Sequence, residues 1–255
     1  MFILNTKNNI KFYTIKAFEE SGLVRHAFST RIGGVSVGEA ATMNFGFNRK
    51  DTSENIYKNF GLLCGVTGID KNALVMAKQV HGNDVYVAEG KDVGNRIDSV
   101  DALVTNDPSV AICTFHADCT PLFFLDTRKK VIGLAHSGWR STEKNIAAKT
   151  IEKMQSAFCC NPLDIVSAVG PSIGPCHMEV GQEVAEVFDE KYITYADKPH
   201  INLWNICKDQ IINAGVKEGN ITVANICTCC NNDLFYSYRG DNKKTGSMTA
   251  IIQLI

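Results

Sequence analysis

The chain has 255 residues, of which 45% are hydrophobic and 21% charged, a balance typical of a globular protein with a sizeable core. The formal net charge is −1, so composition argues against a nucleic-acid-binding or membrane-surface protein. The N-terminus carries no signal-peptide pattern, and no stretch approaches the roughly 18 apolar residues of a membrane span. We therefore expect a cytoplasmic protein.

The chain predicts a mixture of helices and short strands. A cap-like start followed by apolar residues at helical spacing predicts a helix over 52–65. Short apolar runs predict strands at 73–80, 84–88, 102–105, 110–115, 122–125 and 131–135. Further helices are expected over 142–158, 181–191 and 202–214, and further strands at 165–169, 221–226 and 247–254.

These elements follow one another without a regular alternation of strand and helix, which predicts an α/β or α+β layered fold. No internal repeat and no linker-like stretch interrupts the chain, so we expect a single domain over residues 1–255. Neither a G-x-G-x-x-G segment after a strand nor a G-x-x-x-x-G-K-[ST] segment occurs, and a glycine-rich nucleotide-phosphate loop is therefore not supported.

Three loops each leave the end of an apolar strand and present a nitrogen or sulfur ligand. They carry His81, Cys119 and His136. Two histidines and one cysteine match a catalytic zinc site, which uses three protein ligands and an open position, and the ion lowers the pKa of a bound water to about 7. The same donors suit copper, and without metal Cys119 could act as a thiolate nucleophile. Spacing alone does not separate these readings from ordinary packing.

Several segments, in order from about residue 25 to the C-terminus, resemble the YfiH/YlmD family, also called the laccase-domain or multicopper polyphenol oxidase family (DUF152). The A-D-C-x-P and A-H-x-G-W-R segments are the most specific of them. The segments are Ser29–Ser36, Met43–Gly46, Lys78–Gly82, Ala117–Pro121, Ala135–Arg140, Gly170–Cys176 and Phe235–Arg239.

This resemblance implies a layered α/β/β/α fold of the type shared with cytotoxic-necrotizing-factor-like cysteine hydrolases. It implies a metal ion, usually zinc, on His81, Cys119 and His136. It also implies phosphorolysis of adenosine, inosine, guanosine and methylthioadenosine, together with deamination of adenosine. A nucleoside and phosphate would then be the partners of a monomer or weak homo-oligomer.

Several neighbours of the expected ligands are candidates for the purine reactions. Asp118 is a candidate acid or base because it precedes Cys119. Arg31 and Arg140 are candidate phosphate donors because guanidinium matches phosphate oxygens, although structural ion pairs are an equal alternative. Gln79 and Asn44 could read the edges of a purine.

Other histidines and cysteines lie outside the expected ligand set. His116 is expected not to be a ligand because it falls outside the matched motif, whereas Cys176 and His177 could border the pocket. The Cys227, Cys229 and Cys230 run resembles a metal clip but lacks a second spaced pair, so we expect it to be structural or loosely redox-active. The adjacent Cys159 and Cys160 are expected to pack.

One departure from the family pattern concerns the C-terminal segment. Where the family usually has a second arginine and a T-G-R sequence, this chain has Gly240 and Ser247. If those arginines hold phosphate or an acidic substrate, substrate preference is shifted in this chain.

Two other enzyme functions stay open beside the purine reading. One is a copper phenol oxidase, against which the six histidines weigh, because a blue site and a trinuclear copper site together need more imidazole ligands. The other is a metal-free Cys–His amidohydrolase acting on peptidoglycan precursors. A non-enzymatic metal-binding partner of the envelope machinery has no support in the charge pattern.

Overall fold

The computed structural model describes residues 1–255 and contains six α-helices and fifteen strands. The helices are α1 (Lys16–Ser21), α2 (Ser53–Thr67), α3 (Trp139–Glu143), α4 (Ile146–Phe158), α5 (Gln182–Ala185) and α6 (Leu203–Asn213). The strands are β1 (Phe2–Lys7), β2 (Ile10–Ile15), β3 (Val24–Ser29), β4 (Leu74–Lys78), β5 (Val85–Val87), β6 (Arg96–Asp98), β7 (Ala102–Thr105), β8 (Ala111–His116), β9 (Thr120–Asp126), β10 (Val131–Ser137), β11 (Ile165–Val169), β12 (Ile193–Tyr195), β13 (Pro199–Ile201), β14 (Ile221–Val223) and β15 (Met248–Leu254).

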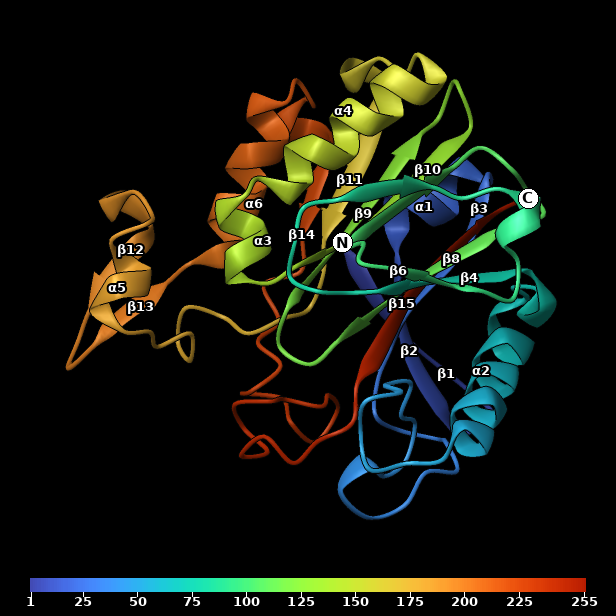
Figure 1. Ribbon diagram of the computed structural model, residues 1–255, viewed down its shortest axis with the longest axis horizontal. Coiled ribbons are helices and arrows are strands. Elements are labelled where there is room, and N and C mark those ends of the chain that lie inside the picture. Colours follow the sequence, from blue (N-terminus) through green and yellow to red (C-terminus); the bar gives the residue numbers. More distant parts are fainter.

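Two mixed sheets form the centre of the molecule. The first has the order β1-β2-β3-β15-β8-β4-β6, and the second has the order β14-β11-β9-β10-β7-β5 (Figure 1). The chain crosses between the sheets several times, and two of these crossings are the β4–β5 and β8–β9 connections. These crossings bring loops from both sheets to one end of the molecule.

The central strands are buried on both faces, and alternate side chains enter different apolar clusters. In β9, Phe123 and Leu125 join the cluster between the two sheets, whereas Leu122 and Phe124 face the helices. In β15 the alternation separates Ile252, between the sheets, from Ile251 on the outer side. Successive side chains of a strand point to opposite faces of the sheet, so each nearly continuous apolar strand contributes to two layers of core.

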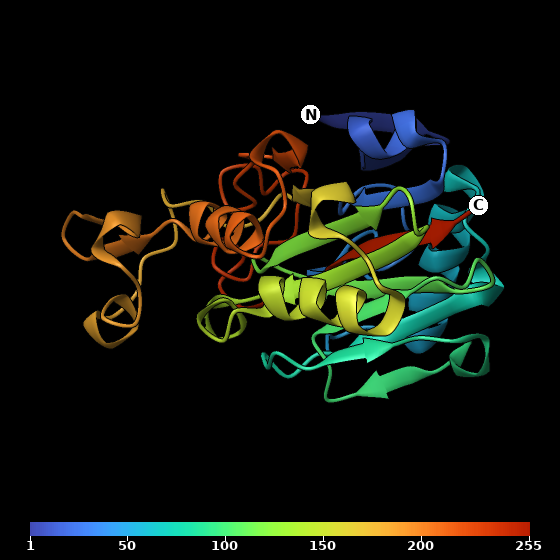
Figure 2. The same ribbon diagram turned by 90° about the horizontal axis from the view of Figure 1, so that it is seen from above.

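Helices cover the outer faces of both sheets. Helix α2 packs Ile56 and Phe60 against the outer face of the first sheet, and α4 packs Ile151 and Met154 against the second, alongside α6 (Figures 1 and 2). The order of layers is therefore helix, sheet, sheet, helix, and the predicted α/β/β/α architecture is confirmed.

Most predicted elements are present, but two helices differ. The helix predicted over 142–158 begins only at Ile146, because Asn145 adopts a left-handed backbone with φ of 60° and separates α3 from α4. The helix predicted over 181–191 is wrong beyond the four residues of α5. Figures 1 and 2 both show this segment and the β12–β13 hairpin extending away from the two sheets.

The N-terminal strands β1, β2 and β3 lie next to one another at one edge of the first sheet and were not predicted from the sequence. None of the helices has the length and apolar character needed to cross a membrane.

Candidate metal centre

His81, Cys119 and His136 converge at the end of the sandwich where the chain crosses between the sheets. His81 lies in the β4–β5 crossing, Cys119 in the β8–β9 crossing, and His136 near the end of β10. Their ligand atoms all lie within 4.8 Å of one another. His81 and Asp118 have left-handed backbones, with φ of 59° and 82°, which turn these short loops sharply toward the centre.

Asp101 organises two of the three ligands and was not predicted from the sequence. This fully buried carboxylate accepts hydrogen bonds from the N–H groups of Val80, His81 and Gly82, at 2.7–3.1 Å. The same carboxylate lies 2.8 Å from Nδ1 of His136. A carboxylate behind a metal-binding histidine fixes the ring and strengthens it as a ligand. The only feature of the sequence that could have indicated this role is the position of Asp101 directly before an apolar strand.

The two histidines differ in charge. Burial opposes the charged form of His136, but the Cys119 sulfur and the Asp101 carboxylate outweigh it and raise the pKa of His136 to about 9. Burial and the nearby His136 lower the pKa of His81 to about 4. His81 therefore presents a free lone pair at neutral pH. The proton on His136 must be released before that ring can bind a metal ion.

Gly138 leaves the space in which two ligands sit. A Cβ atom at this position would stand 2.6 Å from Nδ1 of His81 and 3.1 Å from Sγ of Cys119. Any side chain here would displace the ligands, which explains glycine at this point of the A-H-x-G-W-R segment.

The three ligands line a cavity of about 530 Å³. Its wall is rich in cationic and aromatic side chains and contains no carboxylate. The lining includes Phe47, Arg49, Lys78, Gln79, Arg96, Phe115, Arg140, Tyr238 and Ser247. A second cavity, of about 240 Å³, also adjoins His81 and Cys119, and its lining includes Trp139, Met178 and Leu203.

Besides the three ligands, three of the predicted site residues lie at the cavities. Arg140 lines both cavities and stacks over Trp139, with 4.1 Å between guanidinium carbon and ring centroid. Gln79 lines the larger cavity, but its amide bonds both the N–H and the carbonyl of Phe115. Asp118 lines the smaller cavity, and its carboxylate accepts from the Thr228 hydroxyl and the Arg239 N–H. The side chains of Gln79 and Asp118 therefore hold neighbouring segments in place.

Arg31 and Asn44 lie outside both cavities. Arg31 stacks over Tyr236, donates to the carbonyl of Asn232 and pairs with Asp241. Asn44 is fully buried, and its Oδ1 accepts from the N–H groups of Gly46 and Ser247. Both side chains make structural contacts with the loops around the larger cavity.

His116 approaches the centre without joining it. Its ring nitrogens are bonded to the Thr114 hydroxyl and to the Cys119 carbonyl, at 2.8 and 3.1 Å. Both ring nitrogens are thus engaged, and His116 is not one of the three residues of the ligand group.

Arg49, Arg96, Phe47 and Tyr238 line the larger cavity but were not among the predicted site residues. Tyr238 lay inside a segment matched to the family, yet nothing in its spacing marked it as cavity-lining. Arg49 and Arg96 lie in or beside turns, where isolated basic residues are usually solvated.

The donor set fits a catalytic metal ion. One thiolate and two imidazoles suit zinc or copper better than magnesium or calcium, and all three ligands face the cavity, which leaves one side of an ion open to a small molecule.

The chain is similar to known proteins along most of its length. Residues 25–255 match the family model described as multi-copper polyphenol oxidoreductase laccase. The chain belongs to this family. The protein named purine nucleoside phosphorylase from Bacteroides thetaiotaomicron is 32% identical over 248 residues, covering 91% of this chain and 92% of the relative. Purine nucleoside phosphorylase YfiH from Escherichia coli is 33% identical and covers 89% of this chain and 92% of its own.

Solved structures of the family share the fold. YlmD from Geobacillus stearothermophilus superposes with a TM-score of 0.92 at 27% identity, over 100% of this chain and 99% of that chain. YfiH from Bacillus licheniformis gives the same TM-score at 26% identity and the same coverage. The resemblance of the sequence segments to the YfiH/YlmD family is thereby confirmed.

Proposed function

We propose that the protein is a zinc-dependent purine nucleoside enzyme that catalyses phosphorolysis of adenosine, inosine, guanosine and methylthioadenosine and also deaminates adenosine. Relatives covering about nine-tenths of the chain are named purine nucleoside phosphorylase. The observation that carries the proposal is a group of arginines without carboxylate partners around the larger cavity.

Arg49, Arg96 and Arg140 reach this cavity from three separate segments, and none of them forms an ion pair. Lys78 adds a fourth cation, although it pairs with Asp98 at 2.6 Å. Guanidinium groups that face a carboxylate-free cavity form a site for a dianion such as phosphate.

Ser247 stands at the position where the family usually has an arginine. It lines the cavity, and its hydroxyl accepts a hydrogen bond from Nε of Arg49 at 3.2 Å. A guanidinium therefore stands at this wall of the cavity even though position 247 holds serine. We propose that Arg49 serves the phosphate there.

Aromatic side chains supply a surface for the base. Phe47 and Phe115 meet edge to face, with centroids 6.0 Å apart, and Arg96 stacks over Phe47 at 4.3 Å. Tyr238 also lines the cavity, with the guanidinium carbon of Arg49 5.7 Å from its ring centroid. A purine ring stacks favourably on such faces, while its sugar points toward the cationic wall.

The two reactions make different demands on these residues. In phosphorolysis, a phosphate oxygen bonds to C1′ of the ribose while the C1′–N9 bond breaks and the base leaves with the electron pair. The arginines hold the phosphate in line with that bond. In deamination, water replaces the amino group at C6 and ammonia leaves. A zinc ion on His81, Cys119 and His136 would supply Lewis-acid polarisation at this end of the cavity.

The test is product analysis on zinc-loaded full-length protein. With adenosine and phosphate we expect adenine and ribose 1-phosphate beside the products of deamination, and without phosphate we expect only inosine and ammonia. Cys119→Ala should abolish both activities, whereas Cys159→Ala, at an exposed cysteine outside the site, should retain them.

Absence of product from every purine nucleoside, in metal-replete protein supplied with phosphate, would contradict the proposal. Phenol oxidation by copper-loaded protein in place of nucleoside turnover would support the oxidase alternative. Release of an amino acid from peptidoglycan precursors by metal-free protein would support the amidohydrolase.

A further inference from the structure

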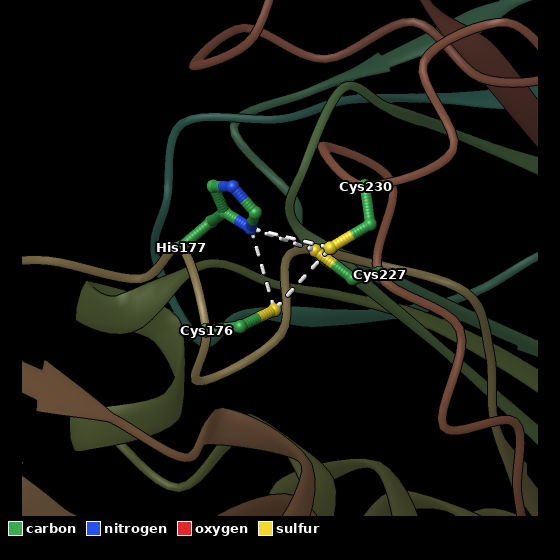
Figure 3. Close-up of side chains that lie close together, drawn as sticks. All are labelled: Cys176, His177, Cys227 and Cys230. Carbon is green, nitrogen blue, oxygen red and sulfur yellow. Dashed lines mark hydrogen bonds between the residues drawn. The ribbon is translucent and has the colours of Figure 1, made fainter.

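A second group of metal-ligating side chains lies outside the site described above. Cys176 and His177 belong to the loop that follows β11, and Cys227 and Cys230 belong to the loop that follows β14. Figure 3 shows the four side chains pointing toward a common centre. Their ligand atoms all lie within 4.8 Å of one another, and all three cysteines are free thiols.

The separations match a tetrahedral site. The Sγ atoms of Cys176 and Cys230 are 3.5 Å apart, and Nδ1 of His177 lies 3.3, 3.3 and 3.7 Å from the sulfurs of Cys176, Cys230 and Cys227. A tetrahedron with metal–ligand bonds of about 2.0–2.3 Å has edges of roughly 3.5–3.8 Å. The four groups thus already stand near the corners that one ion would impose.

We propose that Cys176, His177, Cys227 and Cys230 bind a second zinc ion, in a closed structural site with three thiolates and one imidazole. Cys227 and Cys230 have the C-x-x-C spacing of a zinc knuckle, and the adjacent Cys176 and His177 complete the ligand set. Three soft sulfur donors select zinc over magnesium or calcium.

The surroundings of Cys227 resemble those of a bound thiolate. The backbone N–H of Gly174 donates to the Cys227 sulfur at 3.2 Å. Gly174 has no space for a side chain, because a Cβ atom there would stand 2.6 Å from the Trp204 ring. The close approach that this glycine permits brings the amide onto the sulfur, and such hydrogen bonds stabilise a thiolate ligand.

Cys229 lies in the same run but outside the cluster. The Cys229 sulfur instead lies beside Gly240, where a Cβ atom would make a tight contact with it at 3.3 Å. Cys229 is absent from the ligand group, so the clip uses the first and last cysteines of the run. The sequence alone did not separate these three cysteines.

The second site joins two loops that also hold the segment containing Cys119. Ile173 donates its N–H to the carbonyl of Asp118, and the Thr228 hydroxyl donates to the Asp118 carboxylate. The Arg239 guanidinium donates to the carbonyl of His177 while its backbone N–H donates to Asp118. A metal ion between the loops would therefore fix Asp118 and, through it, the residue next in sequence.

The decisive measurement is the metal content of the full-length protein, purified with zinc and freed of loosely bound ions. We expect two zinc ions per chain, corresponding to the two ligand groups. Cys230→Ser should lower the content by one ion, and the matched control Cys229→Ser should leave it unchanged. His81→Ala should remove the other ion, so each site is read separately.

Cobalt gives a second readout that does not depend on a variant folding. The wild-type chain titrated with Co²⁺ should develop sulfur-to-cobalt absorption for both sites, about three times stronger for the site with three thiolates than for the site with one. A single zinc ion per chain, unchanged in Cys230→Ser, would overturn the proposal. So would a Cys176–Cys230 disulfide in the peptide map of unreduced protein. Neither result depends on whether the protein acts on purine nucleosides.

Discussion

Gly138 supports the metal centre without donating a ligand to it. It stands at the start of α3, directly after β10, with an extended backbone at φ of −79°, so its importance lies in the missing side chain and not in an unusual conformation. The space it leaves is filled by Nδ1 of His81 and Sγ of Cys119. A site of this kind depends on the residues that leave room for it as much as on its ligands.

We expect Gly138→Ala to weaken metal binding at this centre by about 10- to 100-fold, the range seen when residues that orient metal ligands are changed. The reason is the 2.6 Å separation that the new methyl group would have from His81. Competition with a chromophoric chelator measures the affinity. The matched control is Gly61→Ala in α2, where a Cβ atom meets nothing within 4 Å. Unchanged affinity in Gly138→Ala would show that the loops carrying His81 and Cys119 can move to accept the methyl group without weakening metal binding.

The residues of the centre could be predicted to different degrees. His81, Cys119 and His136 stand at strand ends beside turn residues, and the ordered family segments made them a site. Asp101 could not be found in this way, because its role depends on the β4–β5 crossing passing over the start of β7. Arg31 carried the right chemistry for phosphate, yet Tyr236 and Asp241 hold it away from the cavity.

At the scale of elements, the junction of α3 and α4 depends on Asn145. This residue has φ of 60° and ψ of 44°, and its N–H donates to the carbonyl of Thr142. Asparagine tolerates this left-handed conformation better than most residues do. The helical periodicity of the sequence runs through the junction, which is why one continuous helix was predicted.

Substitutions at Asn145 should separate backbone conformation from side-chain contacts. We expect Asn145→Ala to lower the free energy of unfolding by about 1 kcal/mol, because alanine disfavours the left-handed region, and Asn145→Gly to change it little. Urea denaturation of both variants measures the difference. Equal stabilities would mean that the junction relaxes to a continuous helix and that the left-handed residue is not required.

A buried histidine in β3 makes the stability of the fold depend on pH. His26 in β3 is 4% exposed, and its Nε2 accepts a hydrogen bond from the Ile15 N–H at 2.6 Å. Burial lowers the pKa of His26 to about 4 from the ordinary value of 6.5. Between these two values the unfolded chain binds a proton that the folded chain excludes. Stability contributed by neutral His26 is therefore present above pH 6.5 and is lost as the pH falls toward 4.

We expect the free energy of unfolding to fall by roughly 3 kcal/mol more in wild type than in His26→Gln between pH 7 and pH 4, since each unit of pKa difference corresponds to about 1.4 kcal/mol. Glutamine keeps an acceptor for the Ile15 N–H but does not titrate in this range. Denaturant midpoints across the pH series test the expectation. Parallel curves for the two proteins would exclude His26 as the source.

Fully buried strands were more predictable from the sequence than partly exposed ones. Strands buried on both faces, such as β9 and β10, are continuous apolar runs that can be recognised directly. Strand β1 is partly exposed and contains Asn5, Thr6 and Lys7, so it shows no such run and is defined only by its pairing with β2. Pairing of this kind depends on residues distant in sequence, which local patterns do not contain.

At the scale of the whole molecule, both metal-ligand groups depend on contacts between distant segments. The crossings of the two sheets assemble His81, Cys119 and His136, and the loops after β11 and β14 assemble Cys176, His177, Cys227 and Cys230. Because β11 and β14 are parallel neighbours, the loops that follow them leave the sheet at the same edge. Cys176 and His177 are thereby brought beside Cys227 and Cys230, and they form the second pair of ligands that the sequence around Cys227 lacks.

The arginine-lined cavity is likewise a property of the whole molecule, since Arg49 precedes α2, Arg96 begins β6 and Arg140 lies in α3. If these cations bind phosphate, removing one should affect phosphorolysis more than deamination, which consumes water. We expect Arg96→Met to raise the KM for phosphate by about 10- to 100-fold, the equivalent of one charge-assisted hydrogen bond. Arg128→Met, at an exposed arginine paired with Asp164, is the matched control and should leave it unchanged.

The salt dependence of the KM for phosphate shows whether Arg96 acts on phosphate through its charge or has only a structural role. In wild type, the KM for phosphate should rise with ionic strength, and in Arg96→Met this dependence should be shallower, because one fewer charge acts on the ligand. The KM for adenosine in deamination should respond weakly to salt in both proteins. Equal loss of both activities in Arg96→Met, with an unchanged salt dependence, would mean that Arg96 serves by stacking on Phe47, 4.3 Å away, and that the phosphate binds elsewhere.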